Sequence, residues 1–229
     1  MLQLQDYSVA YGQSTIINEM NLTLGDNEII AVLGRNGMGK TTLMKSLIGM
    51  IPSQGGSAKL NATELTPLKS YQRVGAGVGF VPQGRMIFST MTVKENIETG
   101  LTSTGKKDIP EDLYTLFPVL KEMQGRRGGN LSGGQQQQLA IARALASDPC
   151  VLLLDEPTEG IQPNIIKEMA QTLRRIRDER GLSILVSEQV LSFALDVADR
   201  ILVIEKGKIV LDVPVGEADQ DMISKYLSV

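Results

Sequence analysis

Short hydrophobic runs bounded by turn-forming residues recur along the chain and predict buried strands. The clearest runs cover residues 28–33, 78–81, 151–154, 183–186 and 201–204. Runs that are apolar at consecutive positions are typical of parallel strands covered on both faces. Helical patterns lie between most of them, including residues 41–50 and 163–180. This alternation predicts an α/β fold with a mostly parallel sheet.

The chain is expected to form a single domain over residues 1–229. This length suits one large core and is too short for two. Between about residues 91 and 147 the strand signal is absent and helical patterns take over, which indicates a helical subdomain inserted in the core. Residues 1–27 and 54–65 have the pattern of short strands and turns. They predict a small antiparallel sheet at the edge of the core.

Composition excludes several kinds of chemistry and of partner. The chain has no histidine, which rules out histidine acid catalysis, Ser-His nucleophiles and histidine metal sites. Its 23 basic and 26 acidic residues leave a net charge of -3, so we expect no nucleic-acid partner. The start shows neither a basic leader nor a signal-length apolar stretch, and no apolar run approaches the roughly 18 residues that span a bilayer. We expect a chain that does not cross a membrane by itself.

The sequence GRNGMGKT at residues 34–41 satisfies the phosphate-loop pattern Gly-x-x-x-x-Gly-Lys-Ser/Thr, between a predicted strand and a predicted helix. Glycines let the backbone curl around phosphate oxygens, and the following helix adds its positive N-terminal end. Lys40 is expected to reach the β and γ phosphates of ATP, and the Thr41 hydroxyl to bind Mg²⁺. The flanking elements argue against a glycine-rich turn that binds nothing. The expected nucleotide contacts are Gly34, Arg35, Asn36, Gly37, Met38, Gly39, Lys40, Thr41 and Thr42.

The hydrophobic run VLLLDE ends in Asp155 and Glu156. Both carboxylates should therefore emerge at the carboxyl end of a buried strand, where ligands of open α/β sheets collect. We expect Asp155 to hold the magnesium ion, and Glu156 to orient and polarise the water that attacks the γ phosphate. Alone, the pair would equally suit a solvated strand end. The phosphate loop makes the catalytic interpretation the better one.

The sequence LSGGQ at residues 131–135 begins a predicted helix that runs to about residue 147. Between a phosphate loop and VLLLDE, it resembles the signature of ATP-binding cassette (ABC) ATPases, and the resemblance covers nearly the whole chain. The implied fold is an ABC-type P-loop ATPase core with an N-terminal antiparallel β subdomain and an inserted helical subdomain. Helix-start N–H groups make a second anion site. The resemblance implies a head-to-tail dimer in which this site contacts the partner's nucleotide through Ser132, Gly133, Gly134 and Gln135.

Two further residues match the family, although each match is weak evidence for a nucleotide contact when taken alone. Tyr11, in VAYGQ, resembles the aromatic residue that stacks on adenine, although an edge-strand tyrosine often only packs. Gln83, in GFVPQ, resembles the glutamine that meets magnesium and the attacking water. The resemblance also implies that RMIFSTMTVKENI, which follows Gln83, is the surface that docks on membrane partners.

The sequence departs from the family pattern at two positions. Gln189 stands where most members have a histidine that contacts the γ phosphate, and it can offer only a neutral hydrogen bond. Gln162 stands where an aspartate often crosses the dimer interface. Together with EGIQP, these departures resemble the second ATPase subunit of importers for branched-chain amino acids, amides and urea. GRNGMGKTT and VPQGRMIF favour the urea branch.

The resemblance implies an ATPase that powers uptake of a small polar solute from the cytoplasmic face of the inner membrane, as a peripheral subunit. The implied partners are a second copy or a related ATPase subunit, two permeases and, indirectly, a periplasmic solute-binding protein. The alternative is a soluble ABC ATPase acting on nucleic acid or ribosomes. Those proteins carry long coiled coils or two cassettes in one chain, and this chain has neither. A phosphate-loop kinase or GTPase would have no role for LSGGQ.

Overall fold

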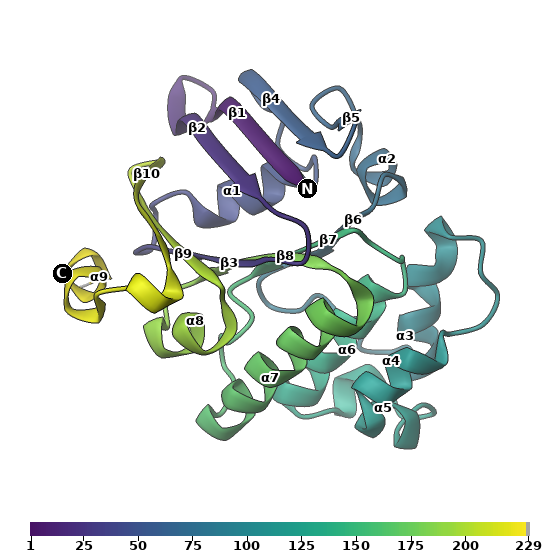
Figure 1. Ribbon diagram of the computed structural model, residues 1–229. Helices are drawn as coiled ribbons and strands as arrows, with labels where there is room; N and C mark the ends of the chain where they lie inside the picture. The colour runs from purple at the N-terminus through teal and green to yellow at the C-terminus, as the bar shows by residue number, and fades with distance from the viewer. Residues whose placement is uncertain (228–229) are drawn as a thin grey trace.

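The central six-stranded sheet runs through the middle of the molecule (Figure 1), which a computed structural model describes for residues 1–227. Its strand order is β10-β9-β3-β8-β7-β6, and every neighbouring pair is parallel except β10 and β9. All five predicted strands are present, with ends that differ by at most two residues. The strands are β3 (Ile29–Leu33), β6 (Val78–Val81), β7 (Val151–Asp155), β8 (Ser183–Glu188), β9 (Arg200–Glu205) and β10 (Lys208–Pro214).

The predicted antiparallel sheet is present as a separate layer above the central sheet (Figure 1). Its order is β2-β1-β4-β5, and all its pairs are antiparallel. The strands are β1 (Leu2–Tyr11), β2 (Ser14–Leu24), β4 (Gly55–Leu60) and β5 (Thr63–Glu64). The predicted α/β class with a mostly parallel sheet and an N-terminal antiparallel part is therefore confirmed.

Helices fill the space between the sheets and cover the far face of the central sheet (Figure 1). Helix α1 (Lys40–Leu47) lies between the two sheets. On the opposite side of the central sheet lie α6 (Gly133–Leu145), α7 (Pro163–Arg180) and α8 (Leu191–Val197) (Figure 1). Side chains of β3 alternate between two separate hydrophobic clusters, so this strand contributes to both cores. The remaining helices are α2 (Ser70–Gly75), α3 (Val93–Gly100), α4 (Glu111–Leu116), α5 (Pro118–Glu122) and α9 (Gln220–Leu227). Short 3-10 turns lie at Leu101–Ser103, Gly128–Asn130 and Val215–Glu217.

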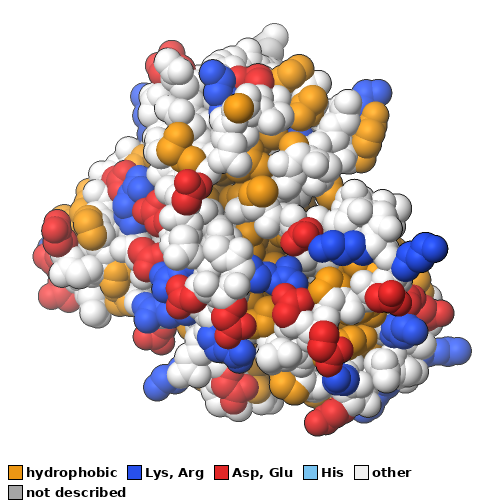
Figure 2. All heavy atoms as spheres, turned by 45° about the vertical axis from the view of Figure 1, so that its right-hand side comes forward, with side chains coloured by type: hydrophobic (Ala, Val, Ile, Leu, Met, Phe, Trp, Pro, Cys, Tyr) orange, Lys and Arg blue, Asp and Glu red, His pale blue; other side chains and the backbone are white. Residues whose placement is uncertain are grey.

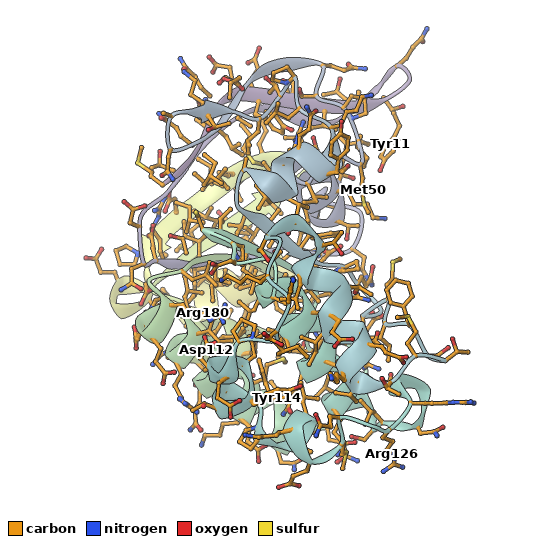
Figure 3. All side chains as sticks on the ribbon, turned by 90° about the vertical axis from the view of Figure 1, so that its right-hand side faces the viewer. Tyr11, Met50, Asp112, Tyr114, Arg126 and Arg180 are labelled. Atoms are coloured by element: carbon orange, nitrogen blue, oxygen red, sulfur yellow. The ribbon has the colours of Figure 1, made fainter. Side chains whose placement is uncertain are left out.

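All elements between β6 and β7 are helices, as predicted for this segment. This segment packs against α7 through a charged contact at its edge, labelled in Figure 3. Arg180, in the last turn of α7, donates to Asp112 of α4 at 2.8 Å and to the Leu145 carbonyl at the end of α6 at 3.0 Å. One side chain therefore joins three helices.

The sequence analysis placed the end of one helix wrongly and missed several elements. The helix predicted over residues 41–50 ends at Leu47, because Gly49 takes a left-handed backbone with φ 82°. The antiparallel strand β10 was missed; its residues alternate between exposed and partly buried, so no continuous apolar run marks it. The short helices α8 and α9 were also missed. No helix within residues 1–227 is long and apolar enough to cross a bilayer.

Charged side chains are interspersed on the face drawn in Figure 2, with acidic and basic groups side by side. Lys106 pairs with Asp148 at 2.7 Å, and Lys121 pairs with Glu111. Exposed pairs of this kind contribute at most about 1 kcal/mol each. The stability of the fold therefore rests on the two hydrophobic clusters and on the polar groups buried beside them.

Arg73 of α2 is the largest of the fully buried side chains, at 2% exposed. Its guanidinium donates to the carbonyls of Ser46 (2.6 Å) and Leu47 (3.0 Å) in the last turn of α1. It also donates to the carbonyls of Leu68 (3.0 Å) and Thr66 (3.3 Å). Helix-end carbonyls have no partner within the helix, and a cation suits this end of the helix dipole. Arg73 therefore holds the end of α1 in place.

Arg73→Leu should lower the free energy of unfolding by about 3 kcal/mol, because it leaves buried carbonyls without a donor. Guanidinium denaturation followed by circular dichroism measures the change. Arg126→Leu is the matched control, since Arg126 is exposed and extends away from the body of the protein (Figure 3). Equal changes in the two variants would contradict the role of Arg73.

Candidate active site

The loop between β3 and α1 surrounds an open cavity of about 280 Å³. Gly37 and Gly39 take positive φ values of 80° and 107°, which side-chain-bearing residues rarely adopt, and α1 then begins at Lys40. Gly34 is closely packed instead: a Cβ there would lie 2.7 Å from the Ile204 carbonyl of β9. The cavity is lined by Ile16, Asn36, Gly37, Gly39, Lys40, Thr41, Thr42, Gln83 and Glu156. The loop thus has the backbone shape that phosphate binding requires.

Lys40 is buried at the base of this cavity, with 3% of its surface exposed. Its ammonium donates to the carbonyl of Gly34 at 2.7 Å and to that of Arg35 at 3.2 Å. It also lies 3.2 Å from Oε1 of Glu156. The loop and β7 therefore fix one positive charge where the predicted phosphates would lie.

Asp155 ends β7 beside the phosphate loop. Its Oδ1 accepts hydrogen bonds from the hydroxyls of Thr41 (3.1 Å) and Ser187 (2.7 Å). Its Oδ2 is buried and accepts no hydrogen bond from the described part of the chain. Burial raises the pKa of Asp155, because desolvation disfavours the charged form. A buried, unpartnered carboxylate oxygen beside a threonine hydroxyl is a set of oxygen donors that suits Mg²⁺.

Glu156 lies one residue farther along, at the mouth of the cavity. Its carboxylate accepts hydrogen bonds from the amide of Gln189 at 2.9 Å and from the amide of Gln83 at 3.3 Å. Its backbone φ is 46°, a strained value for a side-chain-bearing residue, and its N–H donates to the Ser187 carbonyl at 3.0 Å. Two amides from separate loops and the Lys40 ammonium at the start of α1 therefore converge on one carboxylate.

The LSGGQ segment forms a capped helix start away from this cavity. The Ser132 side chain accepts from the Gln135 N–H at 3.4 Å, and the Gln135 amide oxygen accepts from the Ser132 N–H at 3.0 Å. None of Ser132, Gly133, Gly134 and Gln135 lines the phosphate-loop cavity of the same chain. Their predicted role at a partner's nucleotide stays a prediction.

Three other predicted nucleotide contacts have side chains that face elsewhere. Arg35 donates to the Tyr226 carbonyl of α9 at 3.1 Å, and Met38 packs on the core with its sulfur accepting from the Lys206 N–H at 3.4 Å. The Met38 N–H also donates to the Arg35 carbonyl at 3.4 Å, so neither this N–H nor the two side chains are directed at a phosphate. Tyr11 ends β1 with half its surface exposed, at the margin of the antiparallel layer (Figure 3), and does not line the cavity. Its adenine contact also stays a prediction.

Arg85, two residues after Gln83, was missed by the sequence reasoning. Its guanidinium donates to the carbonyls of Glu159 (2.9 Å) and Gly160 (3.4 Å) and to the Gln136 side chain (3.4 Å). It thereby connects the loop of Gln83, the loop after Glu156 and the helix that begins with the signature. Nothing in the local sequence pairs residues 74 positions apart, so only the tertiary structure reveals this contact.

The family comparison agrees with this arrangement, since residues 17–159 match the family model described as ABC transporter. The chain belongs to the ABC transporter family. It is an ABC ATPase, a transporter subunit that binds and hydrolyses ATP. The resemblance inferred from the motifs is thereby confirmed.

The relatives of this ABC ATPase include transport ATPases from bacteria and archaea. It is 38% identical over 214 residues to the high-affinity branched-chain amino acid transport ATP-binding protein BraG of Pseudomonas aeruginosa, covering 92% of this chain and 91% of BraG. It is 32% identical over 212 residues to the probable branched-chain amino acid transport ATP-binding protein LivF of Archaeoglobus fulgidus, covering 91% of this chain and 90% of LivF.

Solved structures share the fold of this ABC ATPase. One is a dimeric ATP-binding cassette in a post-hydrolysis state bound to ADP and Pi, with a TM-score of 0.83 and 22% identity over 94% of this chain and 99% of that chain. Another is an ABC transporter cassette in its ADP conformation, with a TM-score of 0.82 and 23% identity, covering 99% of this chain and 94% of that chain.

Asp155→Asn should raise the melting temperature of the nucleotide-free protein. In the wild-type protein, ATP with Mg²⁺ should raise the melting temperature more than ATP with EDTA does, and Asp155→Asn should abolish this difference. A carboxyl whose pKa is raised by folding stabilises the fold when protonated, and this contribution is lost as the pH rises through the raised pKa. Each kcal/mol regained corresponds to about 2–4 °C in a chain of this size.

Differential scanning fluorimetry at pH 7 measures both effects. Asp196→Asn, on the surface helix α8, is the control and should leave the magnesium-dependent rise intact. A lower melting temperature, or an unchanged response to magnesium in Asp155→Asn, would contradict this account of the carboxylate.

Proposed function

We propose that this ABC ATPase powers uptake of a small polar solute, a branched-chain amino acid, an amide or urea, through partner permeases. The observation that carries the proposal is the convergence of Lys40 and Glu156 on one cavity at the carboxyl edge of the sheet, where Asp155 accepts a hydrogen bond from Thr41 of the cavity lining. BraG and LivF are named for branched-chain amino acid transport, which supports a solute of this kind. The EGIQP segment and Gln189 support this group of solutes, and GRNGMGKTT and VPQGRMIF favour urea among them.

In the proposed mechanism, the phosphate loop and Lys40 hold the β and γ phosphates of ATP. The carboxylate of Glu156 accepts a hydrogen bond from the attacking water and orients it toward the γ phosphorus, as general bases do. Gln83 and Gln189 position that carboxylate through their amides. A magnesium ion, when bound, would be held by Thr41, Asp155 and Gln83 and would neutralise charge on the phosphates.

The working unit in this proposal is a head-to-tail dimer, either with a second copy or with a related ATPase subunit. The signature residues do not line the cavity of their own chain, which leaves the helix start at Ser132 free to contact a partner's γ phosphate. Such a site is complete only when two chains meet. ATP binding would then close the dimer, and hydrolysis would reopen it.

The proposed contact with two permeases lies on the segment after Gln83. Met86 and Phe88 are 63% and 48% exposed, unusual values for large apolar side chains, and they suit a partner's apolar groove or helix. The Arg143 guanidinium lies 5.3 Å from the Phe88 ring centre and so ties this segment to α6. In this proposal residues 91–147 move as a unit and transmit nucleotide state to the permeases. A periplasmic solute-binding protein would deliver the solute, and the chain would lie peripherally on the cytoplasmic face.

Glu156→Gln should retain ATP affinity and reduce hydrolysis by about 10²-fold or more, because the amide cannot accept the proton of the attacking water. Size-exclusion chromatography with ATP should then show a trapped dimer that the wild-type protein forms only transiently. Glu159→Gln is the matched control, since this exposed residue lies three positions on. Normal turnover by Glu156→Gln would refute the assignment of the base.

Mixing two inactive variants tests the shared site. Lys40→Ala removes the phosphate-loop charge, and Ser132→Arg blocks the signature, so each homodimer has two defective sites. A mixed dimer has one intact site. Activity should return to at most about a quarter of wild type, because random pairing makes about half the dimers mixed. No recovery, under conditions where the wild-type chain hydrolyses ATP as a dimer, would contradict the cross-chain arrangement.

A further inference from the structure

Glu188, the last residue of β8, is a buried carboxylate to which the mechanism above assigns no role. It is 2% exposed, and no Lys or Arg among residues 1–227 forms an ion pair with it. A buried carboxylate without a cation must be stabilised by hydrogen-bond donors. Glu188 has four such donors, and they come from two different loops.

The two oxygens of Glu188 divide these donors between them. Oε1 accepts from the N–H of Thr158 at 3.0 Å and from its hydroxyl at 2.5 Å. Oε2 accepts from the N–H of Gln189 at 2.8 Å and from the N–H of Val190 at 3.2 Å. One oxygen therefore holds the loop after Glu156, and the other holds the loop that begins with Gln189.

Both loops carry groups that determine the position of the Glu156 carboxylate. Thr158 lies two residues after Glu156, whose backbone is strained at φ 46°. The side chain of Gln189 donates to Oε1 of Glu156 at 2.9 Å. A carboxylate that holds the backbone of Thr158 and Gln189 thus constrains Glu156 in two ways, through the loop that follows it and through its partner Gln189.

We propose that Glu188 is a positioning residue for hydrolysis, acting through Gln189 on the carboxylate of Glu156. The inference rests on the proposed function of Glu156 as the base. A carboxylate is suited to this place because it offers acceptors only, and all four facing groups are donors. Glutamine has the same shape but one acceptor oxygen, so its amide must turn a donor toward one of the two loops. The Gln189 amide, which has no charge of its own, then loses its fixed position.

The test is a double-mutant cycle on the full-length chain with Glu188→Gln, Gln189→Ala and the double variant. Steady-state ATP hydrolysis gives kcat and KM for each. Glu188→Gln should lower kcat by about tenfold and leave KM within about twofold, because the phosphate loop is untouched. The double variant should lie within about twofold of the slower single variant, since the two residues act in series.

Two controls separate positioning from general loss of structure. Ser183→Ala removes a buried hydroxyl at the other end of β8, where it donates to the Gly25 carbonyl at 2.7 Å; it should lower the melting temperature without changing kcat. Thr158→Ser keeps a hydroxyl for Glu188 and should retain most of kcat, whereas Thr158→Val should resemble Glu188→Gln.

Multiplicative losses in the double variant would overturn the proposal, as would a change confined to KM. An equal fall in kcat for Ser183→Ala at an equal fall in melting temperature would also overturn it. Failure of the proposed base is a separate result, because it appears as normal turnover in Glu156→Gln regardless of the cycle at residue 188.

Discussion

The parallel register of β3, β8 and β7 is the constraint on which the candidate site depends. In this register Leu33 lies beside Glu188, and Asp155 lies beside Ser187. The carboxyl ends of the three strands therefore reach the same edge of the sheet together. The phosphate loop, the acids Asp155 and Glu156 at the end of β7, and the loop of Gln189 all begin at this edge. A shift of one strand by a single residue would reverse its inward and outward side chains and separate Asp155 from Thr41.

The charged side chains buried at this edge of the sheet lower the stability of the fold. The strands below are fully buried, so the acids at their ends lie where water is scarce, and desolvation raises the pKa of Asp155. The fold compensates locally, through two hydroxyls on one oxygen of Asp155, the Lys40 ammonium on Glu156, and four donors on Glu188. The exception is Oδ2 of Asp155, which is buried and accepts no hydrogen bond within residues 1–227. A buried polar atom without a partner at such a place indicates a ligand rather than a structural role.

The sequence predicted the strands and the phosphate loop because their signals are local. A continuous apolar run marks each buried parallel strand, and glycines with positive φ, such as Gly39, mark the loop. It missed β10, whose pattern resembles an exposed segment, and it overextended α1 past Gly49. Asp155, Glu156, Gln83 and Gln189 were each predicted from a motif, but their mutual distances depend on strand order, which periodicity does not give. The roles of Arg85 and Glu188 could not be predicted for the same reason, since Arg85 contacts Glu159 and Glu188 contacts Thr158 across the fold.

Because the chain has no histidine, the residue at position 189 can offer the site a neutral hydrogen bond but no positive charge. An imidazolium would bring a second cation next to Lys40, whereas the amide of Gln189 donates a hydrogen bond without a charge and without a titration near neutral pH. Its benefit to Glu156 therefore depends entirely on direction and distance, since a neutral hydrogen bond weakens steeply when misaligned. A charge can act through several ångströms of imperfect geometry, but an amide cannot. With an amide in place of a cation, the interaction with Glu156 therefore depends on a rigid Gln189 loop. The N–H groups of Gln189 and Val190 fix this loop by donating to Oε2 of Glu188.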